Sequence, residues 1–246
     1  IELITVGTEI LLGNIVNTNA QFLAQKCASL GYSVFYQSTV GDNEERLSQQ
    51  LTIALDRSDI VILSGGLGPT EDDLTKETVA KLCYIPLIED DHTKKRIKSY
   101  FSKTGRKPSD NNWKQALIPE GAIVLDNENG TAPGMIVEWN GKSIVLLPGP
   151  PNELIPMVND KLTPYLEKKI PHTILSAMVK ICGIGESKVE TIIRDLIDQQ
   201  TNPTIATYAK TGEVHVRVTA SAKTEKDAKK MIKPVIEELK KRSGSA

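Results

Sequence analysis

The sequence is poor in cysteine: its 246 residues include only Cys27, Cys83 and Cys182. Because the number is odd and the three residues lie far apart within apolar patterns, we predict buried, reduced thiols in a cytoplasmic protein rather than a disulfide framework. Their spacing also offers no cysteine-based metal site.

The sequence also has no excess of positive or negative charge, since it contains 30 Lys and Arg residues and 31 Asp and Glu residues. That balance argues against a general surface for nucleic acid or for an anionic membrane. The sequence shows no signal peptide and no apolar run long enough to span a bilayer. We therefore expect neither nucleic acid nor membrane as a partner, and a cytoplasmic location.

Three common catalytic signatures are absent as well. The sequence has no pyrophosphatase box of the Nudix kind, no Walker lysine and no visible Ser-His-Asp arrangement. The sequence therefore offers no independent catalytic motif of these kinds.

Apolar strands alternate with amphipathic helices along the first two thirds of the chain. Strands are predicted at 2–6, 34–40 and 60–63, and Asp42 and Glu45 form the expected capping pair of the second helix. This alternation predicts an α/β fold, with a mostly parallel sheet sandwiched by helices. The length allows a larger and a smaller domain, which we place at residues 1–169 and 170–246.

The stretch from Asp59 to Thr75 carries the strongest chemical signals. Its strand runs into a glycine-rich loop and then into three adjacent carboxylates: Ser64, Gly65, Gly66, Gly68, Glu71, Asp72 and Asp73. Backbone amides of such a loop suit phosphate oxygens, and clustered carboxylates suit a hard divalent cation. The stretch thus predicts a metal-assisted phosphate or nucleotide site. The alternative is a plain helix N-terminus whose acids favour the helix dipole.

Loops that follow parallel strands share one edge of a sheet, and ligands of open α/β sheets bind at that edge. Gly7-Thr8-Glu9, which follows the first strand, should therefore lie on the same side as residues 65–73. Asn17 and Asn19 stand at the start of the next helix, where they are either N-caps or nucleotide contacts.

Asn140-Gly141 predicts a tight hairpin between strands 135–139 and 142–147. If Trp139 pairs with Lys142, the glycine-proline loops 130–134 and 148–151 lie side by side. The second strand is the more apolar, so we expect it to enter the sheet in parallel and to bring both loops to the ligand-binding edge.

From His172 onward the pattern becomes strand, helix, two strands and helix, which predicts a compact α+β domain. Its Gly183-x-Gly185 resembles loops that grip nucleic-acid backbones only superficially, because Glu186 follows and local positive charge is weak. The basic run 94–107 is either a solvated helix face or a source of contacts to a substrate phosphate.

Four motifs, in order, resemble those of the competence-damage-inducible CinA family and cover the front two thirds of the chain. They occupy residues 7–13, 64–73, 130–134 and 147–153. The front domain also resembles the molybdopterin-binding fold of the MoaB and MogA proteins, and the second domain is similar to the middle domain of the CinA family.

The resemblance implies metal-dependent hydrolysis of ADP-ribose to AMP and ribose 5-phosphate, a step of pyridine-nucleotide recycling, by a homodimer. The implied cofactor is a divalent ion of the Mg, Mn or Co class, with a monovalent cation as a second candidate. Family members also carry a C-terminal domain that deamidates nicotinamide mononucleotide, and nothing in this sequence resembles that domain.

Under this hypothesis Asp72 and Asp73 are the metal ligands and catalytic residues, and Glu71 or Glu153 orients or deprotonates the water. The substrate-binding residues are expected on the loops of the same edge. They are Gly7, Thr8, Glu9, Asn17, Asn19, Ser64, Gly65, Gly66, Gly68, Thr70, Gly134, Pro148 and Gly149.

Two alternatives stay open, because a fold does not determine its ligand. One is a molybdopterin-binding or adenylyl-transferring enzyme that uses the same glycines and metal. The other is a non-catalytic nucleotide-binding or protein-binding module linked to competence. Residues 148–153 and the attached second domain favour the CinA hypothesis over the first.

Overall fold

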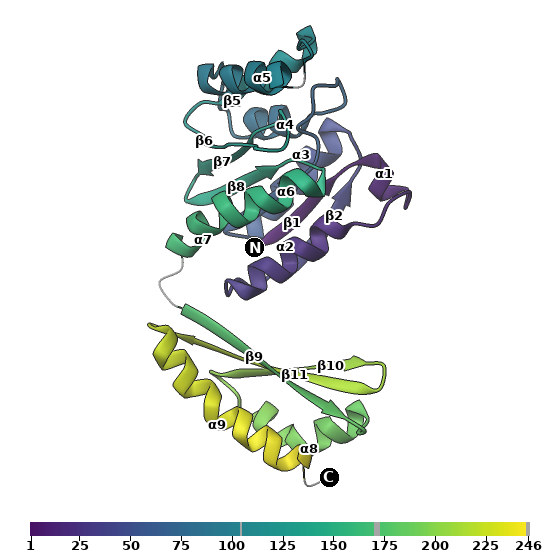
Figure 1. The fold of residues 1–246 in the computed structure, drawn as a ribbon, viewed down its shortest axis with the longest axis vertical. Coiled ribbons are helices and arrows are strands. Elements are labelled where there is room, and N and C mark those ends of the chain that lie inside the picture. Colours follow the sequence, from purple (N-terminus) through teal and green to yellow (C-terminus); the bar gives the residue numbers. More distant parts are fainter. Residues whose placement is uncertain (104, 170–172, 245–246) are drawn as a thin grey trace. The chain divides into compact units, whose positions relative to one another are not determined.

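The structure is a computed structural model that describes residues 1–103, 105–169 and 173–244. The chain divides into two compact units, Ile1–Ala28 with Tyr32–Leu166, and Ser29–Gly31 with Glu167–Ala246 (Figure 1). The boundary predicted between residues 169 and 170 adjoins a segment, 170–172, that lies outside the described residues. Within the described part, no helix is both long enough and apolar enough to cross a membrane.

A six-stranded sheet forms the centre of the first unit, in the order β2-β1-β3-β8-β7-β6. The first four strands in this order are parallel and the last two antiparallel: β2 (Tyr36–Val40), β1 (Glu2–Val6), β3 (Ile60–Ser64), β8 (Lys142–Leu147), β7 (Gly134–Trp139) and β6 (Ile123–Leu125). This confirms the predicted mostly parallel sheet and the parallel entry of β8. Trp139 pairs with Lys142, as the Asn140-Gly141 turn predicted.

Helices cover both faces of this sheet, which is why every residue of β1 and β3 is buried. Figure 1 shows α2 and α6 on one side and α3 on the other. The helical elements of the unit are α1 (Thr8–Leu11), α2 (Thr18–Ser29), α3 (Glu44–Arg57), α4 (Thr75–Leu82), α5 (Asp91–Lys103), the 3₁₀ helix η1 (Asp110–Ala116), α6 (Pro151–Met157), the π turn η2 (Val158–Leu162) and α7 (Thr163–Lys169).

The predicted capping pair of α3 is wrong. Asn43 is the N-cap, and its side chain accepts a hydrogen bond from the N–H of Arg46 at 3.0 Å. Asp42 instead accepts bonds from the backbone N–H and the hydroxyl of Thr8, at 2.9 and 2.8 Å. The Asp42 carboxylate is thereby held against the loop after β1.

Three short elements were not predicted. They are α1 and a separate two-stranded sheet of β4 (Leu87–Glu89) and β5 (Leu117–Pro119). Segments of three or four residues are too short to show a helical or strand period, so tertiary contacts decide their structure.

The second unit contains β9 (Thr173–Cys182), α8 (Glu186–Asp198), β10 (Thr204–Lys210), β11 (Glu213–Ala222) and α9 (Glu225–Gly244). Its antiparallel sheet has the order β10-β11-β9, which confirms the predicted smaller α+β part. Apolar residues of α8, α9 and the sheet form its core, among them Val189, Ile232 and Val216. Cys182 is exposed, which corrects the prediction that all three cysteines are buried.

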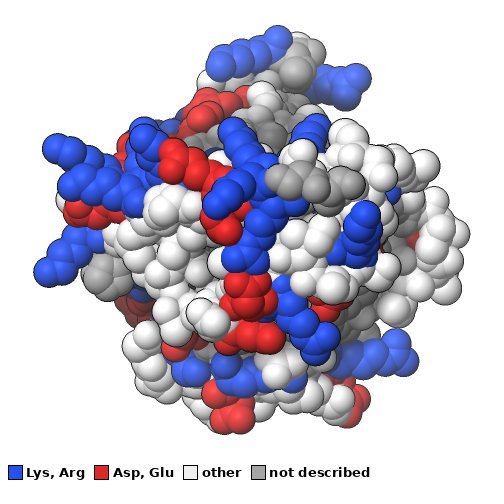
Figure 2. All heavy atoms as spheres, turned by 90° about the horizontal axis from the view of Figure 1, so that it is seen from below, with Lys and Arg blue, Asp and Glu red and all other residues white. Residues whose placement is uncertain are grey.

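Charges of both signs lie close together on the one face of the molecule that Figure 2 presents. Figure 2 shows Lys and Arg interspersed with Asp and Glu on the face that it presents. On α9 several charges pair at a spacing of four residues, for example Lys229 with Glu225 and Arg242 with Glu238. Such pairs are typical of a solvated helix face.

Candidate functional site

The carboxyl ends of the four parallel strands meet at one edge of the sheet in the first unit. The loops that follow them are joined by backbone hydrogen bonds: Gly7 donates to the carbonyl of Val40 at 2.9 Å, and Gly65 donates to that of Leu147 at 3.0 Å. A cavity of about 590 Å³ opens at this edge. Its position is the one that open parallel sheets use for ligands.

Most of the predicted site residues line this one cavity. They are Gly7, Glu9, Asn17, Asn19, Ser64, Gly65, Gly66, Gly68, Asp72, Asp73, Pro148, Gly149 and Glu153. They come from the loops after β1, β3 and β8 and from the starts of α2 and α6, so the fold brings together segments more than a hundred residues apart.

Four predicted residues do not line the cavity. Glu71 is exposed. Thr8 and Thr70 do not line the cavity themselves, but each donates hydrogen bonds to a carboxylate that does: Thr8 to Asp42 and Thr70 to Asp73. Gly134 is buried in β7, where a Cβ atom would lie 2.4 Å from the sulfur of Met157. Gly134 therefore serves the packing of β7 on α6.

The glycine loop has a backbone that only glycine adopts readily. Gly65 has a φ of +101°, and a Cβ atom there would lie 2.1 Å from the carbonyl oxygen of Val6. The fully buried Thr75 locks the loop to α4, because its hydroxyl donates to the carbonyl of Gly65 at 2.8 Å and its N–H donates to that of Gly66 at 3.1 Å. The loop is thus fixed before any ligand binds.

The amides of this loop differ in what they can offer a phosphate. The N–H of Gly65 donates to the carbonyl of Leu147, which continues the hydrogen bonding between β3 and β8, so this amide is not available to a ligand. No described residue accepts a hydrogen bond from the amides of Gly66 or Gly68. Two of the three glycine amides predicted to hold phosphate therefore have no acceptor among the described residues.

The acidic segment that follows, residues 71–73, is held by hydrogen bonds from Thr70. Oδ2 of Asp73 accepts bonds from the N–H of Thr70 at 2.9 Å and from its hydroxyl, and a Cβ atom on Gly68 would lie 2.3 Å from the same oxygen. Hydrogen bonding from Thr70 lowers the pKa of Asp72, so that this carboxyl is ionised at neutral pH. A side chain at position 68 would displace the Asp73 carboxylate from this position.

Glu153, in the first turn of α6, has a different environment. Burial raises the pKa of its carboxyl, and the side-chain amide of Asn127, which donates to Oε2 at 2.6 Å, partly opposes that shift. Asn127 also donates to the carbonyl of Ala132 at 2.8 Å, so the loop before β7 holds Glu153 in place. A carboxylate whose pKa is raised is a better proton acceptor than an ordinary one.

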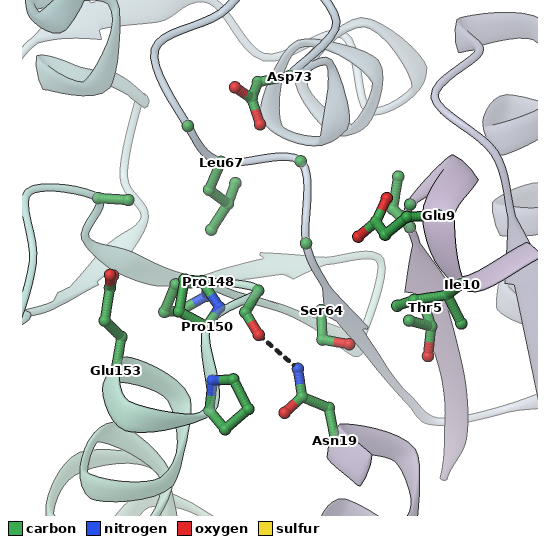
Figure 3. A pocket seen from close by; sticks show the side chains of 18 of the residues that line it. Thr5, Glu9, Ile10, Asn19, Ser64, Leu67, Asp73, Pro148, Pro150 and Glu153 are labelled. Carbon is green, nitrogen blue, oxygen red and sulfur yellow. Dashed lines mark hydrogen bonds between the residues drawn. The ribbon is translucent and has the colours of Figure 1, made fainter. Parts of the chain in front are cut away.

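The two asparagines of α2 are engaged within the protein. Oδ1 of Asn17 accepts from the N–H of Ala20 at 3.0 Å, the contact of an N-cap, and its amide donates to Thr5. Asn19 donates to the carbonyl of Gly149 at 2.6 Å (Figure 3). The N-cap alternative thus describes Asn17, while Asn19 ties the start of α2 to the loop after β8.

The cavity is strongly acidic. Five carboxylates line it: Glu9, Asp42, Asp72, Asp73 and Glu153. Figure 3 shows Glu9, Asp73 and Glu153 placed around the glycine loop from three different segments. Among the described residues of the lining, none is Lys, Arg or His. An anionic ligand can therefore enter only if cations accompany it, because bare carboxylates repel a phosphate.

Two buried polar atoms of the lining have no hydrogen-bond partner in the part of the chain that the structure describes. Ser64 is 2% exposed and its hydroxyl makes no hydrogen bond with a described residue. Gln115 is 3% exposed; its amide donates to the carbonyl of Leu67 at 3.3 Å, and its Oε1 atom is left without a donor. Buried polar atoms of this kind are unfavourable unless a ligand or water satisfies them.

The donor set fits a metal ion that a ligand completes. Between residues 1 and 244, leaving aside those not described, no group of three or more His, Cys, Asp and Glu side chains is arranged to hold a metal. Ions such as Mg²⁺ need only one or two carboxylates, because waters and substrate phosphates supply the remaining ligands. Asp72 and Asp73 can supply two hard oxygen ligands at the cavity.

Several lining residues were not predicted. Asp42 follows the parallel strand β2, and ligands of open α/β sheets bind at the carboxyl ends of such strands. This rule would have predicted Asp42 as a site residue, but the sequence pattern around it favoured a helix cap instead. Ile10, Ile15 and Val16 form an apolar side of the cavity, and Gln115 reaches it from η1. Gln115 carries no sequence signal, because only the tertiary fold brings η1 to the glycine loop.

Comparison with known proteins gives a consistent result for both units. Residues 2–168 match the family described as "Probable molybdopterin binding domain", and residues 176–246 match the "Damage-inducible protein CinA KH domain". A competence-damage inducible protein of Clostridium beijerinckii is 53% identical over 99% of the chain, and a CinA-like protein of Dictyoglomus turgidum is 51% identical over 99%.

The chain spans 59% of the length of each of these two relatives. Among solved structures, the crystal structure of the protein CinA with unknown function from Thermoplasma acidophilum is similar. It is 38% identical, with a TM-score of 0.60, and the match covers 64% of this chain and 92% of that one.

Proposed function

The chain belongs to the CinA family, and from this membership we propose that its first unit hydrolyses the pyrophosphate bond of ADP-ribose in a metal-dependent reaction. Water attacks one phosphorus atom, the bond from that phosphorus to the bridging oxygen breaks, and AMP and ribose 5-phosphate leave. The family likeness suggests this substrate, and the chemistry of the cavity supports a phosphoanhydride.

The single observation that carries the proposal is the charge of the cavity. A loop with free glycine amides faces a space lined by five carboxylates and, among its described residues, by no basic side chain. The amides suit phosphate oxygens, whereas the carboxylates attract the cation that a diphosphate needs.

Asp72 and Asp73 are the proposed metal ligands, because both line the cavity and belong to one braced turn. When bound, a divalent ion of the Mg, Mn or Co class neutralises charge on phosphate oxygens and favours ionisation of a water. Oδ2 of Asp73 is occupied by Thr70, which leaves its other oxygen for the ion. The remaining carboxylates provide negative charge for a monovalent cation as well.

Glu153 is the proposed general base. Its carboxyl lines the cavity and is held by Asn127, and burial raises its pKa toward the range in which a carboxylate accepts a proton from water efficiently. Glu71 is the weaker candidate, because it is exposed and lies outside the lining. Gly66 and Gly68 would hold phosphate oxygens, while Ser64 and Gln115 have polar atoms free for the ligand.

Turnover with and without metal tests this proposal. The chain is incubated with ADP-ribose and Mg²⁺, Mn²⁺ or Co²⁺, and AMP is measured by chromatography, with EDTA as the metal-free control. We expect AMP only with metal, and we expect Asp73→Asn to reduce the rate by at least about a hundredfold while circular dichroism stays unchanged. An unimpaired Asp73→Asn variant would remove Asp73 from the mechanism.

Molybdopterin binding is the second candidate, because the family matched by residues 2–168 carries that description. The same glycine amides and cation would then hold the pterin phosphate. A thermal-shift comparison of ADP-ribose with molybdopterin separates the two ligands. A non-catalytic nucleotide-binding module linked to competence would bind ADP-ribose in the same assay and release no AMP.

The proposal extends to a cytoplasmic homodimer, as the family resemblance implies. Light scattering of the purified chain measures its mass in solution and tests the dimer directly. Deamidation of nicotinamide mononucleotide, implied for the longer relatives, is assigned to none of the described residues.

A further inference from the structure

Two lysines lie close to the acidic segment without lining the cavity. Lys76 is in the first turn of α4, and Lys114 is in η1, some forty residues further along the chain. Lys76 is only 4% exposed, and burial lowers the pKa of its ammonium group. Burying a lysine is costly, so its contacts need an explanation that the catalytic scheme above does not provide.

Lys114 makes its hydrogen bonds to the backbone of the acidic segment. Its Nζ atom donates to the carbonyl of Thr70 at 2.7 Å and to that of Asp73 at 2.6 Å. It also lies 3.9 Å from a carboxylate oxygen of Glu77. An ammonium group has three donors, and the two carbonyls take two of them. Glu77 lies beyond hydrogen-bond distance and acts on Lys114 only through its charge.

The surrounding contacts hold Lys114 in this position. Lys76 donates to the backbone carbonyl of Lys114 at 2.6 Å and lies 3.6 Å from the same oxygen of Glu77. The next residue, Gln115, donates to the carbonyl of Leu67. One short 3₁₀ helix therefore binds three carbonyls of the loop from Leu67 to Asp73.

The placement of charge has a physical reason. Asp72 and Asp73 line the same cavity as three further carboxylates, and like charges that share a cavity repel one another. A lysine inside the cavity would neutralise them, but it would compete with a divalent cation for the same oxygens. Lys114 instead donates to the backbone carbonyls of Thr70 and Asp73. Its positive charge therefore lies beside the acidic segment, while the carboxylate oxygens stay available to a cation.

We propose that Lys114 is a positioning residue which fixes the turn from Thr70 to Asp73 so that Asp72 and Asp73 face an added divalent cation. The metal-binding part of this inference rests on the proposed function. The fixing of the turn does not, because it follows from contacts that involve neither metal nor substrate.

Hydrogen exchange of the amides of Thr70 and Asp73, which are hydrogen-bonded within the turn at 2.9 and 3.2 Å, tests the fixing of the turn. Lys114→Met keeps the length of the side chain and removes its charge and donors, Lys114→Arg restores both, and Lys81→Met is the matched control, since Lys81 is an exposed lysine of α4. In the absence of metal and substrate, we expect exchange at least about tenfold faster in Lys114→Met only, with most of the protection regained in Lys114→Arg. Exchange equal to that of the unmodified chain would overturn the inference.

Titration with Mn²⁺ alone, followed by electron paramagnetic resonance, tests the consequence for the metal. We expect Lys114→Met to weaken Mn²⁺ binding by about 10- to 100-fold, the usual effect of losing a residue that orients metal ligands, and Lys81→Met to leave it unchanged. In turnover, the KM for metal should rise while kcat at saturating metal stays within a few-fold.

The other outcomes separate the hypotheses. A raised KM for ADP-ribose with unchanged exchange and Mn²⁺ affinity would mean that Lys114 contacts the substrate, which contradicts positioning. If the unmodified chain binds no Mn²⁺ and releases no AMP, the proposed function fails and so does the metal-binding part, while hydrogen exchange still decides whether Lys114 fixes the turn.

Discussion

At the scale of single residues, the acids of the cavity differ because their surroundings differ. Asp73 is braced by Thr70 within a tight turn, whereas Glu153 is buried against Asn127 at the start of α6. The first arrangement suits a fixed ligand for a cation, and the second suits a group that takes up a proton. Sequence alone could identify both as acids near glycines but could not distinguish their roles, since burial decides the pKa.

Glu153 should set the acid limb of the pH-rate profile. Protonation removes the base, so activity falls as the pH drops through its pKa, and burial places that fall above the ordinary glutamic acid value of about 4.3. We expect Glu153→Gln to lower kcat by about 10²- to 10⁴-fold and to abolish this limb. The measurement is kcat/KM for ADP-ribose across pH; an unchanged limb in the variant would assign it to another group.

Gly65 should tolerate no side chain. Gly65→Ala combines a φ of +101° with a Cβ atom 2.1 Å from the backbone of Val6, so we expect a loss of about 2 kcal/mol or more in the free energy of unfolding. Gly141→Ala is the control, because it has a positive φ of 76° and no atom within 4 Å. Thermal denaturation of both variants measures the difference, and equal losses would show that steric crowding at Gly65 is unimportant.

At the scale of elements, the strands and the hairpin were the most predictable features. Continuous apolar runs identified β1 and β3, and the Asn140-Gly141 turn fixed the register of β7 against β8. The helix cap was less predictable, because adjacent Asp42 and Asn43 are both good N-caps. The structure separates them: Asn43 caps α3 and Asp42 turns to Thr8 at the cavity.

Substitutions of these two neighbours should therefore have opposite effects. Asn43→Ala removes a cap, so we expect a loss of about 1 kcal/mol in stability with activity retained. Asp42→Asn should leave the stability of α3 unchanged and alter the activity or metal affinity, because its carboxylate lines the cavity. Chemical denaturation and turnover with ADP-ribose measure the two properties; a stability loss confined to Asp42→Asn would contradict this division.

At the scale of the whole molecule, topology explains how distant segments form one site. The order β2-β1-β3-β8 places the ends of four parallel strands side by side, so residues 7, 42, 65 and 148 meet although the sequence separates them widely. This convergence could be predicted from the alternation of strands and helices. The contribution of η1 could not, because its approach to the glycine loop depends on Lys114 and Gln115 contacts that have no local pattern.

The central claim is that this acidic cavity binds a diphosphate only together with a cation. Isothermal titration of ADP-ribose into the chain, once with Mg²⁺ and once with EDTA, tests it most directly. We expect binding with Mg²⁺, and with EDTA an affinity weaker by at least about a hundredfold, since five carboxylates then face the phosphates without a counter-ion. Equal affinity in the two titrations would contradict the claim.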